Sequence, residues 1–350
     1  MSLLILLALL LAPDSVTISN SEVSYEPYPN GTGWFRFVPY GHSFYADVHP
    51  NFVRFDVTAS SNSPAYDWTA TQPGGGTASN RYHAFTYGVF GFSLPIWSGS
   101  FGEDDRFGLA VTMAASANLW LDIFEPQTAP VVNTDYRIGF PSITFIHRFQ
   151  HTFAHNYSIA FSPFKHESTH IGDELQIEHT LADYPLRRVN VSYNYTELLF
   201  TFNEPEDRFS AYHSFRLGLM LLLNPQAGWY TVYPSDGDPS VTSPKNSPFE
   251  LFLQYQYQSQ VSRHGFQALV SAEIRNRVLY GYTSTGDGKQ DERRVFTYNV
   301  FVGPRFNFAY YDGYFSRVAV GFRAYYGNCP YGQFRNIPSY AQFGLSLIFD

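Results

Sequence analysis

Hydrophobic and polar residues alternate with a period of two along much of the chain. The segment ELFLQYQYQSQ at 250–260 is the clearest case. Its apolar residues share one face and its glutamines the other: Leu251, Leu253, Tyr255 and Tyr257 against Gln254, Gln256, Gln258 and Gln260. Successive side chains of a strand point to opposite sides, so this pattern predicts a β-strand with one apolar and one polar face.

The same alternation recurs up to the final segment, YAQFGLSLIF at 340–349. In the segment 314–326, Arg317 and Arg323 fall on the polar face, which indicates that this face meets water. Comparable segments predict strands near 51–59, 82–94, 106–125, 135–149, 153–170, 186–202, 208–222, 248–261, 264–278, 293–308, 314–326 and 338–349. These segments number twelve, and single-chain bacterial barrels have an even number of strands.

The composition indicates what the apolar face meets. Charged residues make up 15% of the chain, against about 25% in ordinary soluble domains, whereas aromatic residues reach 19%. A secreted β-sandwich would need more charges to coat its surface, and no apolar run is long enough for a membrane helix. The chain is therefore predicted to be all-β, a transmembrane antiparallel β-barrel of about 12 strands.

The N-terminus and the charge indicate the location and exclude one class of partner. Residues 3–12 form an unbroken apolar run that is too short to span a bilayer and is typical of a signal peptide, residues 1–12. Residues 13–45 alternate weakly and are predicted to be a leader or a periplasmic segment, and 46–350 the barrel. We expect the bacterial outer membrane as the location and its lipids as partners. The net charge of −8, with no basic run, argues against nucleic acid.

The run His166-Glu167-Ser168-Thr169-His170 matches the zinc-protease pattern H-E-x-x-H. That signature needs a helix, which brings the two histidines one turn apart. Pro163 lies just upstream, and the preceding residues alternate with period two, so a strand is expected instead. The histidines of a strand would lie ~13 Å apart, too far to share one metal ion.

On a strand, His166, Ser168 and His170 share one face. The Cα atoms of His166 and Ser168 would lie about 6.6 Å apart, so their side chains could form a hydrogen bond. A hydroxyl beside an imidazole is a potential nucleophile with its general base. Such a pair needs a third group that orients the imidazole ring.

Four motifs in one order carry a resemblance that covers most of the chain after about residue 50. They are NTDYRIGFP at 133–141, HESTHIGDE at 166–174, RRVNVSYNY at 187–195 and YYGNCPYGQF at 325–334. Together they resemble a family of uncharacterised bacterial outer-membrane proteins. The resemblance implies a fold and a location, and it implies no activity. The last strand is amphipathic and carries the near-terminal Phe349, and this combination resembles the signal by which the barrel assembly machinery recognises outer-membrane barrels.

A second resemblance is local, to outer-membrane phospholipase A, a twelve-stranded barrel. His166-Glu167-Ser168 is similar to its H-x-S element, and Arg187-Arg188-Val189-Asn190 to the Arg-rich strand start that precedes its orienting Asn. The resemblance implies that Ser168 is the nucleophile, His166 the general base and Asn190 the orienting group. In the connection between the two elements, Asp173 and Glu174 could bind calcium, because hard carboxylate oxygens are its ligands.

The alternation of faces predicts a different arrangement. His166 and Ser168 share the parity of Ser158 and Ser162, a polar face, and Asn190 opposes apolar neighbours. This places a polar cluster in the lumen or at its rim: His166, Ser168, His170, Arg188 and Asn190. A bulge at Pro163 would reverse the first half and would not move Asn190. Three functions stay open, namely a structural or small-molecule-binding barrel, which is the leading hypothesis, a serine-type lipid hydrolase, and a narrow pore.

Overall fold

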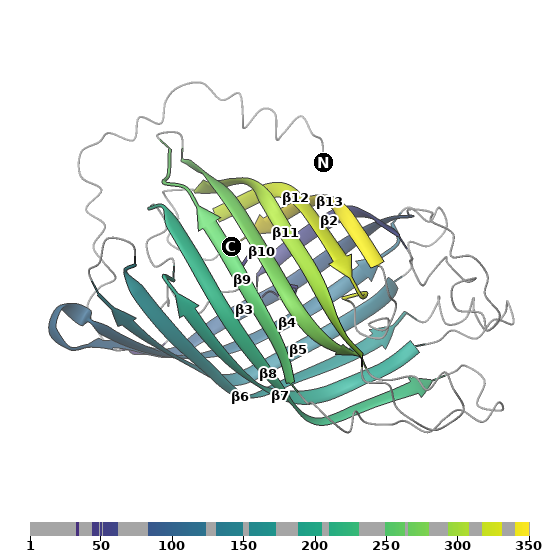
Figure 1. The fold of residues 1–350 in the computed structure, drawn as a ribbon, viewed down its shortest axis with the longest axis horizontal. Helices are drawn as coiled ribbons and strands as arrows, with labels where there is room; N and C mark the ends of the chain where they lie inside the picture. The colour runs from purple at the N-terminus through teal and green to yellow at the C-terminus, as the bar shows by residue number, and fades with distance from the viewer. Residues whose placement is uncertain are drawn as a thin grey trace, which may run out of the picture.

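Twelve strands, β2 to β13, close into one antiparallel barrel in the computed structural model (Figure 1). The structure describes residues 33–34, 44–48, 50, 52–61, 83–123, 131–149, 154–172, 188–204, 210–230, 249–262, 265–279, 293–307, 317–330 and 340–349. Each strand pairs with its neighbour in sequence, and β13 pairs with β2, so the sheet has no open edge. The predicted twelve-stranded barrel is confirmed.

The strands lie close to the segments predicted from alternation. Their bounds are β2 Val53–Ser61, β3 His83–Phe101, β4 Phe107–Leu121, β5 Val131–Arg148, β6 Asn156–Ile171, β7 Arg188–Phe202, β8 Tyr212–Tyr230, β9 Phe249–Gln258, β10 Phe266–Leu279, β11 Arg293–Asn307, β12 Arg317–Gly327 and β13 Tyr340–Phe349. A two-residue strand, β1 Gly33–Trp34, pairs with β3. The one helical element of the described residues is a 3₁₀ turn, Glu103–Asp105.

No helix among the described residues is both long enough and apolar enough to cross a membrane.

The two faces of the sheet differ as the alternation predicts. Leu253 and Leu345 point outward and are 50% and 64% exposed, whereas Gln254 and Gln342 point inward and are buried. Closure satisfies the backbone hydrogen bonds of every strand, so the outer face can be apolar throughout. An apolar exterior around a polar interior is typical of barrels that span a membrane.

Several strands contain an extra residue at a proline, which shifts the register with a neighbouring strand. In β3 the shift lies between Pro95 and Trp97. In β5 it lies at Phe140-Pro141, where Thr112 and Ala114 of β4 pair with Ser142 and Gly139. Proline cannot donate to the ladder and is tolerated at a bulge, where one extra residue reverses the face that follows. Alternation read through a proline that marks such a bulge therefore assigns the wrong face.

A short piece of chain before β2 lies inside the barrel. We call residues 44–47 the inner segment. The Tyr45 amide donates to Gln256 Oε1 at 3.0 Å, and the Ala46 amide donates to Ser271 Oγ at 2.9 Å. Asn299 Nδ2 donates to the Ala46 carbonyl at 2.6 Å, and Arg323 donates to the Tyr45 carbonyl. Strands β9 to β12 thus each bind the inner segment through a luminal side chain.

Aromatic rings of the inner segment pack against luminal side chains of β8 and β11 and against Phe52. The guanidinium of Arg216 lies 4.2 Å from the centre of the Phe44 ring. The Tyr45 ring packs edge-on against Phe52 and Phe301, with centroids 5.5 Å and 5.8 Å apart. Phe44, Tyr45 and Ala46 are all buried, so these three residues pack against the wall as a core does.

We predict that the barrel does not conduct ions, because the inner segment and the luminal ion pairs together obstruct the lumen. The purified protein in a planar bilayer should show no discrete conductance steps. Replacing both rings, in Phe44→Gly with Tyr45→Gly, should produce steps, since glycine keeps the backbone contacts and removes the filling. Steps in the unaltered protein would contradict this structure of the lumen.

Candidate functional site

Strand β6 reverses its face at Pro163. Before the proline, Ile159 and Phe161 point outward and Ser162 is buried. After it, Phe164 points outward and is 46% exposed. The register shows the cause: from Ser162 to Lys165 the strand takes three steps while its partners on β7, Glu197 and Tyr195, are two apart. Pro163 therefore marks a bulge, and the parity of every later residue of β6 is inverted.

This inversion places His166, Ser168 and His170 on the outer face. Glu167 and Thr169, the residues between them, are buried on the luminal side. The prediction that the histidines and the serine belong to a luminal cluster is therefore wrong. Its physical reason is the bulge at Pro163, the alternative held open on the sequence, which the register now shows.

Strand β7 also presents the face opposite to the predicted one. Tyr193 and Tyr195 are among the apolar neighbours that alternation sets opposite Asn190, on the outer side, but they are buried inside. Their phenol groups suit the polar lumen, and the Tyr193 hydroxyl donates to Glu167 Oε2 at 2.9 Å. Asn194, between them in sequence, consequently points outward beside His166.

His166 and Asn194 form the central contact of the site. They are direct partners across β6 and β7, and His166 Nδ1 lies 2.9 Å from Asn194 Oδ1. An amide oxygen only accepts, so Nδ1 carries the proton and donates it. The opposite ring nitrogen, Nε2, then has a lone pair and can act as a base. This is the tautomer and orientation that a Ser-His-Asn arrangement requires.

Ser168 lies one row further along the outer face. Its partners across the neighbouring strands are Tyr136 of β5 and Ser192 of β7. His170 follows on the same face, and its ring packs edge-on against Tyr136 with centroids 5.9 Å apart. Ser168 thus lies between two imidazoles, of which one, His166, is held by an amide.

The surroundings of the site are apolar and open to the outside of the barrel. Tyr136 and Ile138 are each 49% exposed, and Phe164 lies before the site on β6. Ile138 is the direct partner of His166 on β5. The three polar side chains of Ser168, His166 and Asn194 therefore sit in a wall of exposed apolar side chains. We call these three residues the outer triad.

The other predicted site residues are not part of this contact. Arg188 and Asn190 belong to β7, where their backbones pair with Tyr230 and Gly228; their side chains lie outside the described part of the structure. Asn190 is four residues from Asn194, ~13 Å along a strand. Asn194 therefore occupies the position beside His166 that the sequence assigned to Asn190. Asp173 and Glu174 lie outside the described residues.

Within the described ranges, no group of three or more His, Cys, Asp or Glu residues is placed to hold a metal ion. The strand predicted for the H-E-x-x-H run is confirmed, since 166–170 belong to β6.

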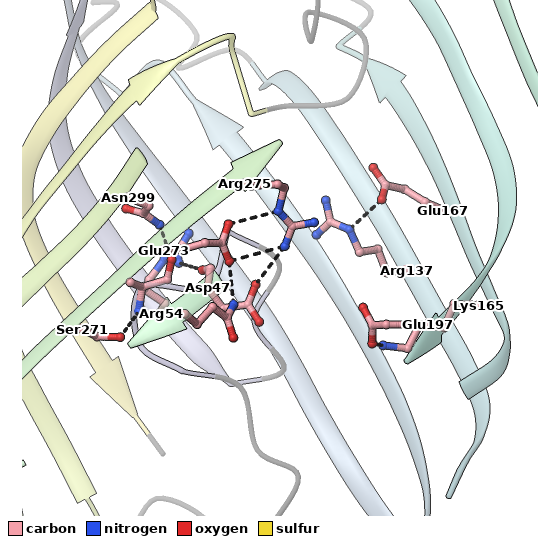
Figure 2. A network of polar contacts seen from close by, with 12 residues as sticks. Asp47, Arg54, Arg137, Lys165, Glu167, Glu197, Ser271, Glu273, Arg275 and Asn299 are labelled. Carbon is pink, nitrogen blue, oxygen red and sulfur yellow. Dashed lines mark hydrogen bonds and ion pairs between the residues drawn. The ribbon is translucent and has the colours of Figure 1, made fainter. Parts of the chain in front are cut away.

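Ion pairs on the luminal side fix the register of β6 beyond its bulge. Lys165 pairs with Glu197 of β7. Glu167 accepts from Arg137 Nε of β5 at 3.0 Å and from the Tyr193 hydroxyl. Figure 2 shows these two pairs on neighbouring strands of one wall.

A slip of β6 by one residue would turn Lys165 and Glu167 to the apolar exterior, and His166 and Ser168 to the lumen. A charge on the lipid face of a barrel costs up to about 2–4 kcal/mol. The luminal charges therefore keep His166 and Ser168 outside.

We predict that Arg137→Leu lowers the free energy of unfolding by about 3–5 kcal/mol, because it leaves the Glu167 carboxylate buried without its cation. Removing both charges, in Arg137→Leu with Glu167→Leu, should recover more than half of that loss. Urea unfolding in lipid vesicles measures both values, and Arg294→Leu, at an exposed arginine of β11, serves as the control. If the double variant is as unstable as the single one, the pair does not anchor the strand.

No family model matches the chain, and no curated protein sequence does. The structure is similar to outer membrane phospholipase A from Escherichia coli, at 10% identity and a TM-score of 0.45, over 86% of this chain and 90% of that one. The corresponding phospholipase dimer from Salmonella typhi with bound calcium is 11% identical with a TM-score of 0.43, over 86% of this chain and 91% of that one. The translocator domain of the autotransporter NalP from Neisseria meningitidis is 12% identical with a TM-score of 0.37, over 85% of this chain and 87% of that one. The closed antiparallel barrel rests on the strand pairing itself, and the resemblance to an uncharacterised family stays a prediction.

Proposed function

We propose that this protein is an integral barrel of the bacterial outer membrane whose outer triad hydrolyses acyl esters of membrane lipids. Ser168 is the nucleophile, His166 the general base and Asn194 the group that orients the imidazole. The observation that carries the proposal is the contact of His166 Nδ1 with Asn194 Oδ1, one row from Ser168 on the exposed apolar wall.

The apolar exterior supports a membrane location. Side chains such as Leu253 and Leu345 are half or more exposed and would meet acyl chains there. Barrels of this type are inserted by the barrel assembly machinery, which we propose as a partner on the pattern of β13. Lipids of the outer membrane are then the molecules that lie against the triad.

The connections between strands indicate the leaflet. At one end of the barrel the strands are joined through long stretches, among them 62–82, 172–187 and 231–248. At the other end the stretches are short, among them 102–106 and 259–265. Outer-membrane barrels have short periplasmic turns and long extracellular loops. His166 and Ser168 lie near the end of β6 that leads into 172–187, so the substrate is a lipid of the outer leaflet.

The chemistry follows from the tautomer of His166. Nε2 accepts the proton of Ser168 Oγ as this oxygen attacks the ester carbonyl carbon, and the imidazolium is stabilised by Asn194 Oδ1. The proton then passes to the departing alkoxide, which leaves as the alcohol and yields an acyl-serine. Water attacks that ester with the same base, which releases a fatty acid and restores Ser168.

The polar groups of the outer triad are otherwise hard to account for. A histidine, an asparagine and a serine on a wall that faces hydrocarbon lower the stability of insertion, and ionisable residues in such places are by default functional. A role in packing the lumen no longer applies, because the triad points away from it. A pore is disfavoured by the inner segment.

We expect Ser168→Ala and His166→Ala each to lower the release of fatty acid from detergent-dispersed phospholipid about 10³-fold or more, because nucleophile and base act as a unit. Asn194→Ala should lower it less. The assay contains calcium, for which Asp173 and Glu174 remain the proposed ligands.

Two matched variants serve as controls in this assay. Asn190→Ala should leave the rate within a factor of about two, since Asn194 holds the ring. Ser162→Ala removes a luminal hydroxyl of the same strand and should also leave the rate unchanged. The hydrolase is refuted if the folded, unaltered protein releases no fatty acid from phospholipid or lipid A.

A further inference from the structure

An arginine lies on the apolar outer wall of the barrel, at the end where the strands are joined by long connections. Arg294 is the second residue of β11 and directly follows the connection 280–292. Its side chain is exposed, and it shares the outer face with Phe296 and Val302, which are 56% and 47% exposed. A cation in a wall of this kind is costly where the wall meets hydrocarbon, so its depth and its contacts decide what it does.

The length of β11 places Arg294 at the edge of the apolar band. At the other end of the same outer face, Phe306 pairs with Phe266, which is 42% exposed and follows the short connection 259–265. The twelve residues from Phe306 back to Arg294 span about 41 Å along an antiparallel strand, or about 31 Å along the membrane normal at a tilt of ~40°. The apolar band of such barrels is about 25 Å tall. With Phe306 at one edge of the band, Arg294 lies at the level of the lipid head groups on the other side.

The guanidinium group of Arg294 lies across β10 and is held there by neutral groups. The backbone of Arg294 pairs with Val278 of β10. Its Nη1 donates to Asn276 Oδ1 of β10 at 2.9 Å and to the Phe249 carbonyl of β9 at 3.4 Å. The guanidinium carbon lies 4.5 Å from the centre of the Phe249 ring, within the range of a cation–π contact. Two neighbouring strands thus hold the cation at one place on the wall.

One edge of this guanidinium group is open. Both hydrogen bonds use Nη1, and within the described part of the chain Nε and Nη2 have no hydrogen-bond partner and no carboxylate forms an ion pair with Arg294. Nε and Nη2 are parallel donors, the pair with which arginine binds phosphate or carboxylate in a bidentate manner. The wall therefore presents a fixed cation with two donors available, which favours an anionic ligand.

We propose that Arg294, oriented by Asn276 and Phe249, binds the phosphate group of a lipid in the outer leaflet. The phosphate oxygens accept from Nε and Nη2, and the acyl chains of the same lipid lie along the exposed side chains of Phe296 and Ile274. A lipid fits this site because its phosphate and its apolar chains match the cation and the wall beside it. The leaflet rests on the orientation proposed above. The site does not depend on the outer triad, which lies on β6 and β7.

Native mass spectrometry of the full chain in a neutral detergent measures lipid binding. The chain carries Ser168→Ala, so that no ester is hydrolysed during the measurement. Dioleoyl phosphatidic acid and dioleoylglycerol have the same acyl chains and differ by the phosphate, so phosphatidic acid should bind at least about fivefold more tightly. Arg294→Gln should remove most of this preference. Arg294→Lys keeps the charge and loses the pair of parallel donors, so its affinity should lie between the two.

Arg106→Gln is the matched control. Arg106 is also exposed but lies in the short connection 102–106, at the other end of the barrel, and its replacement should leave the binding of phosphatidic acid unchanged. The proposal is overturned if Arg294→Gln binds phosphatidic acid as the parent chain does, if dioleoylglycerol binds equally well, or if Arg106→Gln weakens binding as much. Displacement of the lipid by inorganic phosphate would also overturn it, because the site would then be one for free anions.

Discussion

One extra residue in β6, at Pro163, determines which side chains in the rest of this strand face the outside of the barrel. Because side chains of a strand alternate strictly, a single inserted residue exchanges the two faces for the rest of the strand. Before Pro163 the outer face of β6 is purely apolar, with Ile159 and Phe161. After it, the same wall carries His166 and Ser168, and Asn194 of β7 lies beside them. The chemistry proposed for the outer face depends on this bulge.

The inside and the outside of the barrel are coupled through the same strand. Lys165 and Glu167 alternate with His166 and Ser168 along the backbone, and their ion pairs lie in the lumen. Charges that cannot leave the lumen thus hold the triad in place without contacting it. The luminal ion pairs do more than fill the barrel. Arg137 also lines a cavity between the inner segment and the barrel wall.

The sequence was sufficient for the barrel and insufficient for the facing of its site. Alternation predicts the strands because an apolar exterior and a wet lumen act on every residue, as in 250–260. The facing of β6 depends on whether one residue is left unpaired: Pro163 marks the place, but alternation alone does not reveal whether the bulge forms. For β7 a usable signal was present: Leu198, Phe200 and Phe202 point outward, and counting back from them places Asn194 outside. Tyr193 and Tyr195 misled because their rings are apolar, yet both are buried inside, where the Tyr193 hydroxyl donates to Glu167. The position of the inner segment inside the barrel depends on contacts between residues far apart in sequence. No local pattern of residues could have predicted it.

The direction in which Ser168 points can be measured in the membrane. In a chain with Cys329→Ala, a bimane fluorophore is attached at Ser168→Cys or at Thr169→Cys, and the barrel is placed in vesicles that contain nitroxide-labelled lipids. The lipid nitroxides should strongly quench the fluorophore at 168 and hardly affect the one at 169, because adjacent residues of β6 face opposite sides. Quenching at 169 and protection at 168 would contradict the bulge at Pro163 and with it the outer triad.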